Sequence, residues 1–227
     1  MKNILQYLEK SAIMHPGKIV FADADKSITY TSFVEEAMAV GTAIASHLGG
    51  RRNCPVAVIM PRSVENLIAM MGVVYSGNFY VVIDCEMPQA RVEKIFQTLQ
   101  PAAVILPQEW MEERSAWAPD IPFLSYEDCA GTVANNALLG SIRSAMADTD
   151  PLYALFTSGS TGNPKGAVLS HKNVIAYSKW YADTFSITEK TVFANQTPFY
   201  FSMSVSDIFS TMRTGATLHI VPKSLFS

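Results

Sequence analysis

Charged residues are scarce in this sequence of 227 amino acids, and basic residues are not in excess. Only 16% of the residues are charged, and the formal net charge at pH 7 is −3. The adjacent pair Arg51-Arg52 stands alone in a predicted loop. Binding to a nucleic acid backbone requires clustered Lys and Arg side chains. We therefore expect no nucleic acid partner.

Cysteine is rare, and long hydrophobic runs are absent. The three cysteines, Cys54, Cys85 and Cys129, are widely spaced and odd in number, which fits neither a disulfide framework nor a zinc site. The longest apolar run, Leu67–Tyr75, has about half of the ~20 residues that span a bilayer. Met1–Lys10 is interrupted by charge and is unlike a signal peptide. These absences predict a cytoplasmic protein with reduced thiols and no membrane span.

The sequence does contain enough apolar material for a sizeable core, since 49% of its residues are hydrophobic. Length alone allows one or two domains. Helical and extended patterns alternate along the chain. Strands are predicted at Pro55–Met60, Phe79–Ile83, Ala102–Leu106, Thr191–Ala194 and Thr217–Val221, with a short one near Phe123–Tyr126. Helices are predicted at 30–48, 63–76, 88–99, 205–213 and after Ser170, and mainly loops at 107–150. This alternation predicts an α/β fold, with a mostly parallel sheet and helices on both faces.

The most distinctive segment is Thr157–Gly166, which reads Thr-Ser-Gly-Ser-Thr-Gly-Asn-Pro-Lys-Gly. Glycines let backbone N–H groups turn toward an anion, hydroxyl groups add donors, and Lys165 adds a positive charge. The composition therefore suits a polyphosphate. The spacing differs from that of a Walker A loop, because Gly166 follows the lysine, and from the dinucleotide fingerprint, because two residues separate Gly159 from Gly162. A flexible surface turn is the alternative.

Together with Leu152–Phe156, this segment resembles the phosphate-binding loop of the adenylate-forming superfamily. That superfamily includes acyl-CoA synthetases, luciferases, adenylation domains of nonribosomal peptide synthetases and D-alanine–carrier protein ligases. Three weaker matches occur in the family's order: Ser27–Phe33 resembles Thr-Tyr-x-Glu-Leu, Tyr75–Asp84 resembles Gly-x-x-Tyr-Val-Pro-Ile-Asp, and Phe199–Asp207 resembles the substrate-pocket motif Phe-Asp-x-Ser. The likeness covers the whole chain and is greatest to peptide synthetase adenylation domains and D-alanine ligases.

The resemblance implies a ligase that makes an acyl- or aminoacyl-adenylate from ATP and a small carboxylic or amino acid. The acyl group then passes to a thiol, either of an acyl carrier protein or of CoA. ATP and Mg²⁺ are the implied cofactors. The residues implied to hold the phosphates are Thr157, Ser158, Gly159, Ser160, Thr161, Gly162, Lys165 and Gly166. The resemblance assigns no catalytic residue and no metal ligand within this sequence.

Members of the resembling family are considerably longer, and their later motifs for adenine, ribose, magnesium and a C-terminal lysine have no candidate here. We therefore expect the N-terminal part of a larger adenylation-domain architecture, inactive alone. Residues 55–185 are predicted to form an α/β lobe that carries the loop. Residues 1–54 and 186–227 are predicted to contribute to an incomplete second lobe. The alternative is a truncated, non-catalytic binding or scaffold protein that keeps the lobe but has lost the reaction.

The substrate pocket departs from the family pattern. In amino-acid-activating relatives the aspartate of Phe-Asp-x-Ser pairs with the substrate's amino group, whereas here Ser202 follows Phe201. A buried ammonium without a carboxylate is costly, which favours either a substrate without an amine or an amine held by Asp207. The favoured interpretation of Asp207 is that it faces solvent in a helix's first turn. Met203 and Ser206 would line the pocket or, equally, belong to the core.

The four histidines are scattered, and none has partners at the spacing of metal ligands. Ser63 and Ser170 are plausible helix N-caps, and His171 directly follows Ser170. We expect His171 in the first turn of that helix, beside the phosphate loop.

Overall fold

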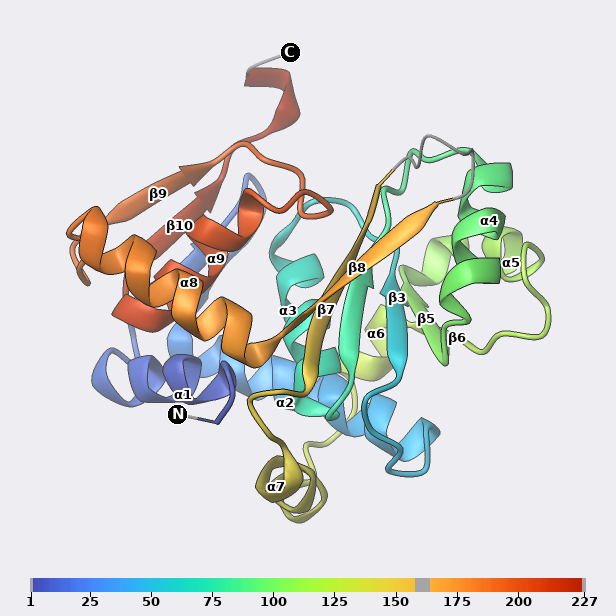
Figure 1. Cartoon of the computed structure of the whole chain (residues 1–227), viewed down its shortest axis with the longest axis horizontal. Helices are drawn as coiled ribbons and strands as arrows, with labels where there is room; N and C mark the ends of the chain where they lie inside the picture. The colour runs from blue at the N-terminus through green and yellow to red at the C-terminus, as the bar shows by residue number, and fades with distance from the viewer. Residues whose placement is uncertain (1, 158–163, 226–227) are drawn as a thin grey trace.

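The computed structural model describes residues 2–157 and 164–225, in which ten strands form two sheets (Figure 1). The six-stranded sheet, in the order β6-β5-β3-β4-β7-β8, contains β3 (Pro55–Val58), β4 (Phe79–Val82), β5 (Ala103–Leu106), β6 (Phe123–Ser125), β7 (Pro151–Thr157) and β8 (Lys165–Ser170). The four-stranded sheet, in the order β2-β1-β10-β9, contains β1 (Ile19–Ala22), β2 (Ser27–Thr29), β9 (Val192–Asn195) and β10 (Thr217–Ile220). The predicted strands are confirmed, with small shifts at their ends.

Most strand pairs are parallel, as the sequence predicts. The exceptions are β8, which runs antiparallel to β7, and β2, which runs antiparallel to β1. The central strands β4 and β5 are buried along their whole length. Strands that are covered on both faces read as continuous apolar runs, and this is why these two were recognisable in the sequence.

Helices cover both faces of the six-stranded sheet. Alternate side chains of a strand point to opposite faces. On one face, Val58 and Val82 share a core with α3 (Val64–Tyr75) and with the four-stranded sheet. On the other face, Val81 and Val104 pack against α4 (Gln89–Leu99). The predicted fold class, an α/β architecture with a mostly parallel sheet, is therefore confirmed.

The remaining helices are α1 (Leu5–Met14), α2 (Tyr30–His47), α5 (Met111–Ser115), α6 (Tyr126–Ala130), α7 (Asn136–Ala145), α8 (His171–Thr184) and α9 (Ser204–Thr214), with 3₁₀ turns at Gln108–Trp110 and Lys223–Leu225. Ser63 caps α3 by accepting a hydrogen bond from the backbone N–H of Asn66 at 3.3 Å. Ser170 caps α8 in a reciprocal capping box with Asn173. Both predicted N-caps are therefore confirmed.

The expectation of mainly loops at residues 107–150 is wrong, because this stretch contains three helices, α5, α6 and α7. The first two have five residues each, too short to show a helical period. Helix α7 buries only Leu139 and Ile142, so its apolar stripe is narrow. None of the three has a strong local pattern, and α6 and α7 each bury two side chains against neighbouring elements.

Helices α2 and α3 cross with their backbones in close approach. A Cβ atom added to Gly72 would lie 2.4 Å from Cγ1 of Val40, and one added to Gly41 would lie 2.7 Å from Cβ of Tyr75. Neither separation is sterically possible without movement of a helix. The two glycines therefore set the distance between these helices.

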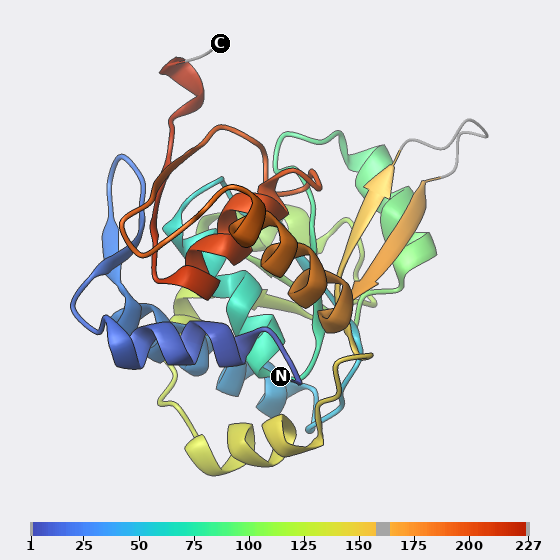
Figure 2. The same ribbon diagram turned by 60° about the vertical axis from the view of Figure 1, so that its left-hand side comes forward.

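Segments from both ends of the chain build the four-stranded sheet. Strand β1 pairs in parallel with β10, with Phe21 opposite Leu218, and the hydroxyl of the buried Tyr30 lies 2.8 Å from the carbonyl oxygens of Thr211 and Ala216. All strands of the larger sheet fall within residues 55–185. Helix α8, however, packs on α9 (Figure 2). The division into lobes at residues 54 and 185 stays a prediction.

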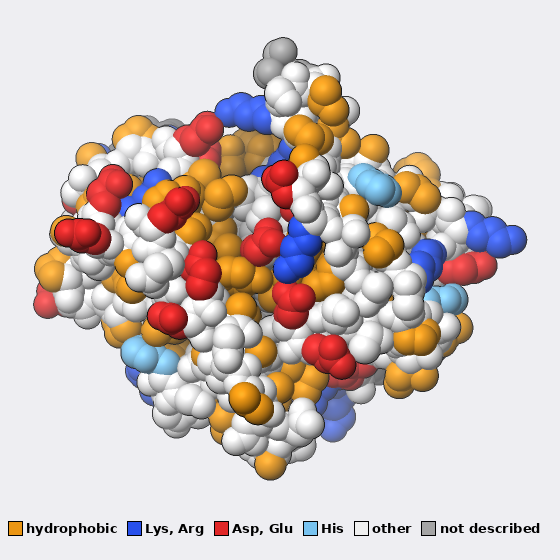
Figure 3. Space-filling view, turned by 180° about the vertical axis from the view of Figure 1, so that it is seen from behind, with side chains coloured by type: hydrophobic (Ala, Val, Ile, Leu, Met, Phe, Trp, Pro, Cys, Tyr) orange, Lys and Arg blue, Asp and Glu red, His pale blue; other side chains and the backbone are white. Residues whose placement is uncertain are grey.

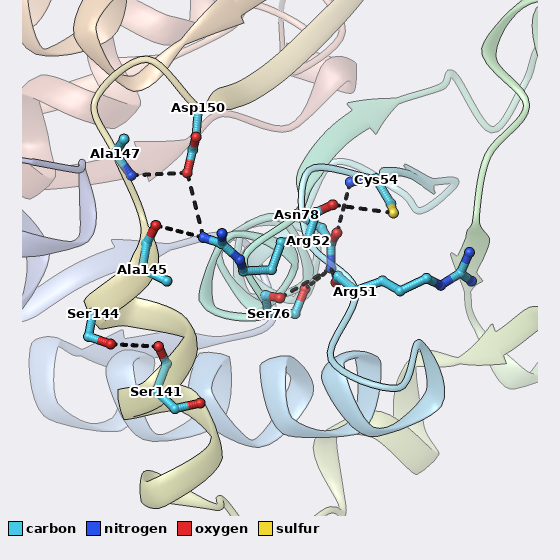
Figure 4. A network of polar contacts seen from close by, with 10 residues as sticks. All are labelled: Arg51, Arg52, Cys54, Ser76, Asn78, Ser141, Ser144, Ala145, Ala147 and Asp150. Carbon is cyan, nitrogen blue, oxygen red and sulfur yellow. Dashed lines mark hydrogen bonds and ion pairs between the residues drawn. The ribbon is translucent and has the colours of Figure 1, made fainter.

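A polar network fixes the turns at the amino ends of β3 and β4 (Figure 4). The side chain of Asn78 accepts a hydrogen bond from the backbone N–H of Cys54 at 2.9 Å and donates one to the carbonyl oxygen of Arg51. The Arg52 guanidinium donates to the carbonyl oxygen of Ala145 at 2.7 Å and lies 3.9 Å from the Asp150 carboxylate. Arg52 therefore joins the β3 turn to the end of α7, and has a structural role.

All three cysteines are free. Burial raises the pKa of the Cys129 thiol to about 11, which leaves little reactive thiolate at neutral pH. Within residues 2–157 and 164–225, no helix is long and apolar enough to cross a membrane.

Candidate functional site

The glycine-rich segment connects the two strands of a β-hairpin. Strands β7 and β8 pair in antiparallel fashion, and the last pair in register is Thr157 with Lys165. The hairpin projects from the body of the molecule (Figure 2). Five of the predicted phosphate-binding residues, Ser158, Gly159, Ser160, Thr161 and Gly162, lie outside the described part of the chain. The structure thus places two of the predicted donors, Thr157 and Lys165, opposite each other and exposed at the base of the loop.

Gly166 has a packing role that does not depend on a ligand. It lies opposite Phe156 in the hairpin, and a Cβ atom added to it would lie 3.1 to 3.4 Å from atoms of the Phe156 ring. Such contacts are tighter than ordinary van der Waals distances. A larger residue would therefore displace the aromatic ring beside the loop.

A cavity of about 480 Å³ opens between the two sheets, at the carboxyl ends of their parallel strands. The segments that line it are the β1–β2 turn at Asp23–Asp25, the residues after β3 at Met60–Ser63, those after β4 at Ile83–Glu86, those after β9 at Gln196 and Pro198–Tyr200, and those after β10 at Pro222–Lys223. Figure 3 shows hydrophobic side chains in the hollow and charged side chains around it. Ligands of open α/β sheets bind outside the carboxyl ends of the strands, which makes this cavity a candidate site.

Sequence reasoning missed this cavity. Its lining comes from segments as far apart as residues 23 and 223, and only the fold joins them. One signal was available: Asp84, Gln196 and Lys223 are polar residues that follow soon after predicted strands. Such residues gather at one edge when the strands are parallel.

The predicted substrate-pocket residues lie at the start of α9 and in the loop before it. Phe201, Ser202 and Met203 are exposed, so this surface is open to a ligand or to further polypeptide. Ser206 is buried, and its hydroxyl lies 2.8 Å from that of Tyr177 on α8. Three of these residues are therefore exposed on one surface, whereas Ser206 points inward, toward the contact between α8 and α9.

Asp207 does not face solvent, and the favoured interpretation of this residue is wrong. It does lie in the first turn of α9, but its half-buried carboxylate accepts a hydrogen bond from the side-chain amide of Asn195 at 3.0 Å. Burial raises the pKa of this carboxyl, and the hydrogen bond from Asn195 opposes that shift. A desolvated carboxylate of this kind is stabilised when a cation approaches it.

Arg62 connects the loop after β3 to the ends of β9 and β10. Its guanidinium donates to the carbonyl oxygen of Asn195 at 3.2 Å and to that of Val221. It also lies 3.5 Å from Oδ1 of Asn195. This contact orients the Asn195 amide so that its nitrogen points to Asp207. Arg62, in the loop after β3, thus holds the end of β9, which leads into the substrate-pocket segment.

Replacing Arg62 with Met is expected to lower the free energy of unfolding by about 1 to 2 kcal/mol, because charged hydrogen bonds to two carbonyl oxygens are lost. Urea denaturation followed by circular dichroism measures this change. Arg91→Met, at an exposed position on α4, is the matched control and should change stability by less than about 0.5 kcal/mol. Equal effects of the two substitutions would contradict the role assigned to Arg62.

His171 is the first residue of α8, as expected, but it does not lie beside the phosphate loop. Strand β8 separates the two, with the loop before Lys165 and the histidine after Ser170. The imidazole is buried, and its Nδ1 accepts a hydrogen bond from the backbone N–H of Ile4 at 3.2 Å. Burial lowers its pKa to about 4, with partial opposition from Asp150 and Asp148. The residue therefore joins α8 to the N-terminal segment as a neutral imidazole.

The described residues do not provide a metal site. Within residues 2–157 and 164–225, no three His, Cys, Asp or Glu side chains converge in a way that could hold a metal ion. A magnesium ion that is bound with a nucleotide takes only one or two protein carboxylates. Asp84 and Glu86 are acidic residues of the cavity, but Glu86 is already paired with Lys223 at 2.9 Å. The structure therefore assigns no magnesium ligand among the described residues.

A family of proteins described as AMP-binding enzymes matches residues 8–226. Among curated proteins, the D-alanine–D-alanyl carrier protein ligase of Listeria welshimeri is 29% identical over 226 residues, which are 99% of this chain but 44% of the relative. The chain therefore spans less than half the length of this relative.

Two solved structures share the fold at low sequence identity. The complex of VinN with L-aspartate gives a TM-score of 0.84 at 18% identity, and the match covers 99% of this chain and 59% of VinN. The nonribosomal peptide synthetase FmoA3 gives a TM-score of 0.80 at 21% identity, and covers 97% of this chain and 22% of that protein. At these identities, the likeness establishes the architecture.

Proposed function

Because this chain belongs to the family of AMP-binding enzymes, which matches residues 8–226, we propose that it supplies the phosphate-binding part of an acid-activating ligase. The ligase makes an acyl- or aminoacyl-adenylate from ATP and a carboxylic acid, and passes the acyl group to a thiol. One observation carries the proposal: the glycine- and hydroxyl-rich segment closes a hairpin with Thr157 opposite Lys165. Both residues are exposed at the ends of this segment.

The proposed role of the loop is to hold the β- and γ-phosphates while pyrophosphate leaves. Phosphoryl and nucleotidyl transfer depend mainly on positioning and on neutralising charge. The Thr157 hydroxyl donates to a phosphate oxygen, and the Lys165 ammonium offsets negative charge as it develops. Ser158, Gly159, Ser160, Thr161 and Gly162 are proposed to supply further N–H and hydroxyl donors. Mg²⁺ is the expected partner of ATP, but no described residues form its site, and no step is assigned to it.

We propose an amino acid as the substrate and a carrier-protein thiol as the acceptor, with CoA as the alternative acceptor. The name of the Listeria welshimeri relative, D-alanine–D-alanyl carrier protein ligase, contains both an amino acid and a carrier protein. Ser202 removes the aspartate expected to pair with the substrate's amine, and the desolvated Asp207 carboxylate is our candidate to replace it. Phe201 and Met203, both exposed, are proposed to contact the side chain of the substrate.

Nucleotide binding to the chain tests the role of the loop. Calorimetric titration is expected to show ATP and pyrophosphate binding more tightly than AMP, because the loop takes the outer phosphates. Lys165→Ala should weaken ATP binding about tenfold, which corresponds to the loss of one charge-assisted contact. Lys190→Ala, which also removes an exposed lysine, is the control and should leave ATP binding unchanged. Equal binding of AMP and ATP, or equal effects of the two substitutions, would contradict the proposal.

The reaction is tested by carboxylate-dependent exchange of pyrophosphate into ATP, measured on the full gene product with panels of amino, aryl and fatty acids. We expect amino acids to support exchange. Exchange with aryl or fatty acids alone would contradict the proposed amino acid substrate but would still support the proposed ligase activity. Nucleotide binding without exchange for any acid would instead support a non-catalytic binding protein.

A further inference from the structure

The described residues that line the cavity between the sheets include none from Thr157–Gly166, and the cavity has no role in the function proposed above. Its volume, about 480 Å³, lies within the range of about 300 to 1,000 Å³ that holds small organic ligands. It opens at the back of the molecule, where Figure 3 shows a hollow with an apolar interior. A site of this size takes a molecule and not a single ion.

The walls of the cavity are apolar and already in place. Met60, Val82, Ile83, Phe199 and Ile220 line it, and each is buried in the fold. Val82 and Ile220 belong to strands of the two sheets, Met60 and Ile83 closely follow β3 and β4, and Phe199 is buried in the turn between β9 and α9. Sheet hydrogen bonds therefore hold most of the wall. A preformed apolar wall binds an apolar ligand body with little ordering cost.

The polar groups of the cavity are mainly acceptors. Four carboxylates line it, from Asp23, Asp25, Asp84 and Glu86, against two cationic side chains. The cations are engaged with acceptors of the protein: Lys223 pairs with Glu86 at 2.9 Å, and Arg62 donates to backbone carbonyl oxygens. When Glu86 and Lys223 are counted as a pair, three carboxylates remain against one arginine, so the field in the cavity favours a cationic donor and disfavours an anion.

A buried amide side chain holds part of the wall in place. Asn66 lines the cavity with 1% of its surface exposed. Its Nδ2 donates to the carbonyl oxygens of Met60 at 3.0 Å and of Pro61 at 3.1 Å, which fixes the orientation of the amide. Its Oδ1 is buried too completely for a molecule in the open cavity to reach it, so Asn66 supports the wall and makes no polar contact with a ligand.

From this geometry we propose that the cavity is a binding site for a small molecule with an apolar body and a protonated amine. The apolar body packs on the walls formed by Val82, Ile83 and Phe199, and the ammonium lies toward the carboxylate of Asp84. A free amino acid is a poorer ligand, because its own carboxylate meets the acidic rim.

A ligand in this cavity would also touch the segment proposed to recognise the substrate. Phe199 and Tyr200 line the cavity, whereas the next residues, Phe201 to Met203, are exposed outside it. The Tyr200 hydroxyl bonds to the Asp84 carboxylate, so the rim and the segment are directly joined. Occupation of the cavity thus fixes the base of the substrate-recognition segment.

Calorimetric titration with three probes of similar shape tests the proposal. 2-Phenylethylamine is cationic, 2-phenylethanol is neutral and 3-phenylpropionate is anionic. We expect the amine to bind at least about fivefold more tightly than the alcohol, as for a partly exposed ion pair, and the carboxylate to bind least. Phenylalanine should bind more weakly than the amine. Equal binding of amine and alcohol, or absence of binding by both, would overturn the proposal.

Substitutions at the cavity test whether the amine and the alcohol bind there. Asp84→Asn keeps the shape of the side chain and should remove the preference for the amine, and Ala24→Trp at the exposed mouth should weaken both amine and alcohol. The controls are Asp183→Asn and Ala137→Trp, which make the same changes at exposed positions on α8 and α7 and should have no effect. Lys165→Ala should leave amine binding unchanged, so failure of the phosphate loop and failure of the cavity are distinguishable. Binding of the amine that survives both Asp84→Asn and Ala24→Trp would refute this location.

Discussion

Gly72→Ala is expected to lower the free energy of unfolding by about 2 to 3 kcal/mol, although alanine is the better helix former. The added Cβ atom would lie 2.4 Å from Cγ1 of Val40 and 3.3 Å from the carbonyl oxygen of Ala37. One neighbour is backbone and the other is a buried, β-branched side chain, so neither moves at low cost. Helices α2 and α3 must therefore separate, which opens the core beneath them. Chemical denaturation at neutral pH measures the loss.

Gly140→Ala provides the matched control. This glycine is exposed in α7, and a Cβ atom added there meets nothing within 4 Å. The substitution should stabilise the protein by up to about 1 kcal/mol through helix propensity alone. If both alanine variants were stabilised, the close approach of α2 and α3 would not limit the packing.

Acidification is expected to destabilise the protein through His171, by up to about 3 kcal/mol between pH 6.5 and pH 4. Burial lowers the pKa of this imidazole to about 4, from an ordinary value of 6.5. As the pH falls between these two values, the unfolded chain takes up a proton that the folded chain does not. The stability that the neutral imidazole contributes is therefore complete above the ordinary pKa and is lost as the pH falls toward 4.

His171→Asn isolates this effect, because the asparagine oxygen keeps an acceptor for the N–H of Ile4 but does not titrate. Both proteins are denatured with urea at pH 7 and at pH 4.5. We expect the wild type to lose more stability than the variant, while other groups, such as the half-buried Glu9 and Asp207 with raised pKa values, affect both alike. The same pH dependence in both proteins would contradict the assignment to His171.

Local patterns were sufficient to predict the strands and several helices. The runs at Phe79–Ile83 and Ala102–Leu106 predicted buried strands because parallel strands are covered on both faces. Ser63 and Ser170 predicted helix starts because a hydroxyl satisfies free N–H groups at an N-terminus. The short helices between residues 107 and 150 were not predicted. They bury few side chains and depend on neighbours that a local pattern does not contain.

The environments of individual side chains were predicted less well. Asp207 was expected in solvent because acidic residues are common in the first turn of a helix, and its contact with Asn195 depends on where β9 ends relative to α9. His171 was expected near the loop because the two are close in sequence. Strand β8 carries it away, since an extended strand advances about 3.3 Å for each residue.

The sequence by itself was sufficient to predict a phosphate-binding segment, because that prediction rests on residue types at fixed spacing within Thr157–Gly166. It also determined the fold class, because the hydrophobic period is local. Only the tertiary structure decided which distant segments meet. It joined β1 to β10, set Arg62 against Asn195, and enclosed a cavity between the carboxyl ends of two sheets. Such contacts depend on how the sheets pack on each other, and no local pattern records that packing.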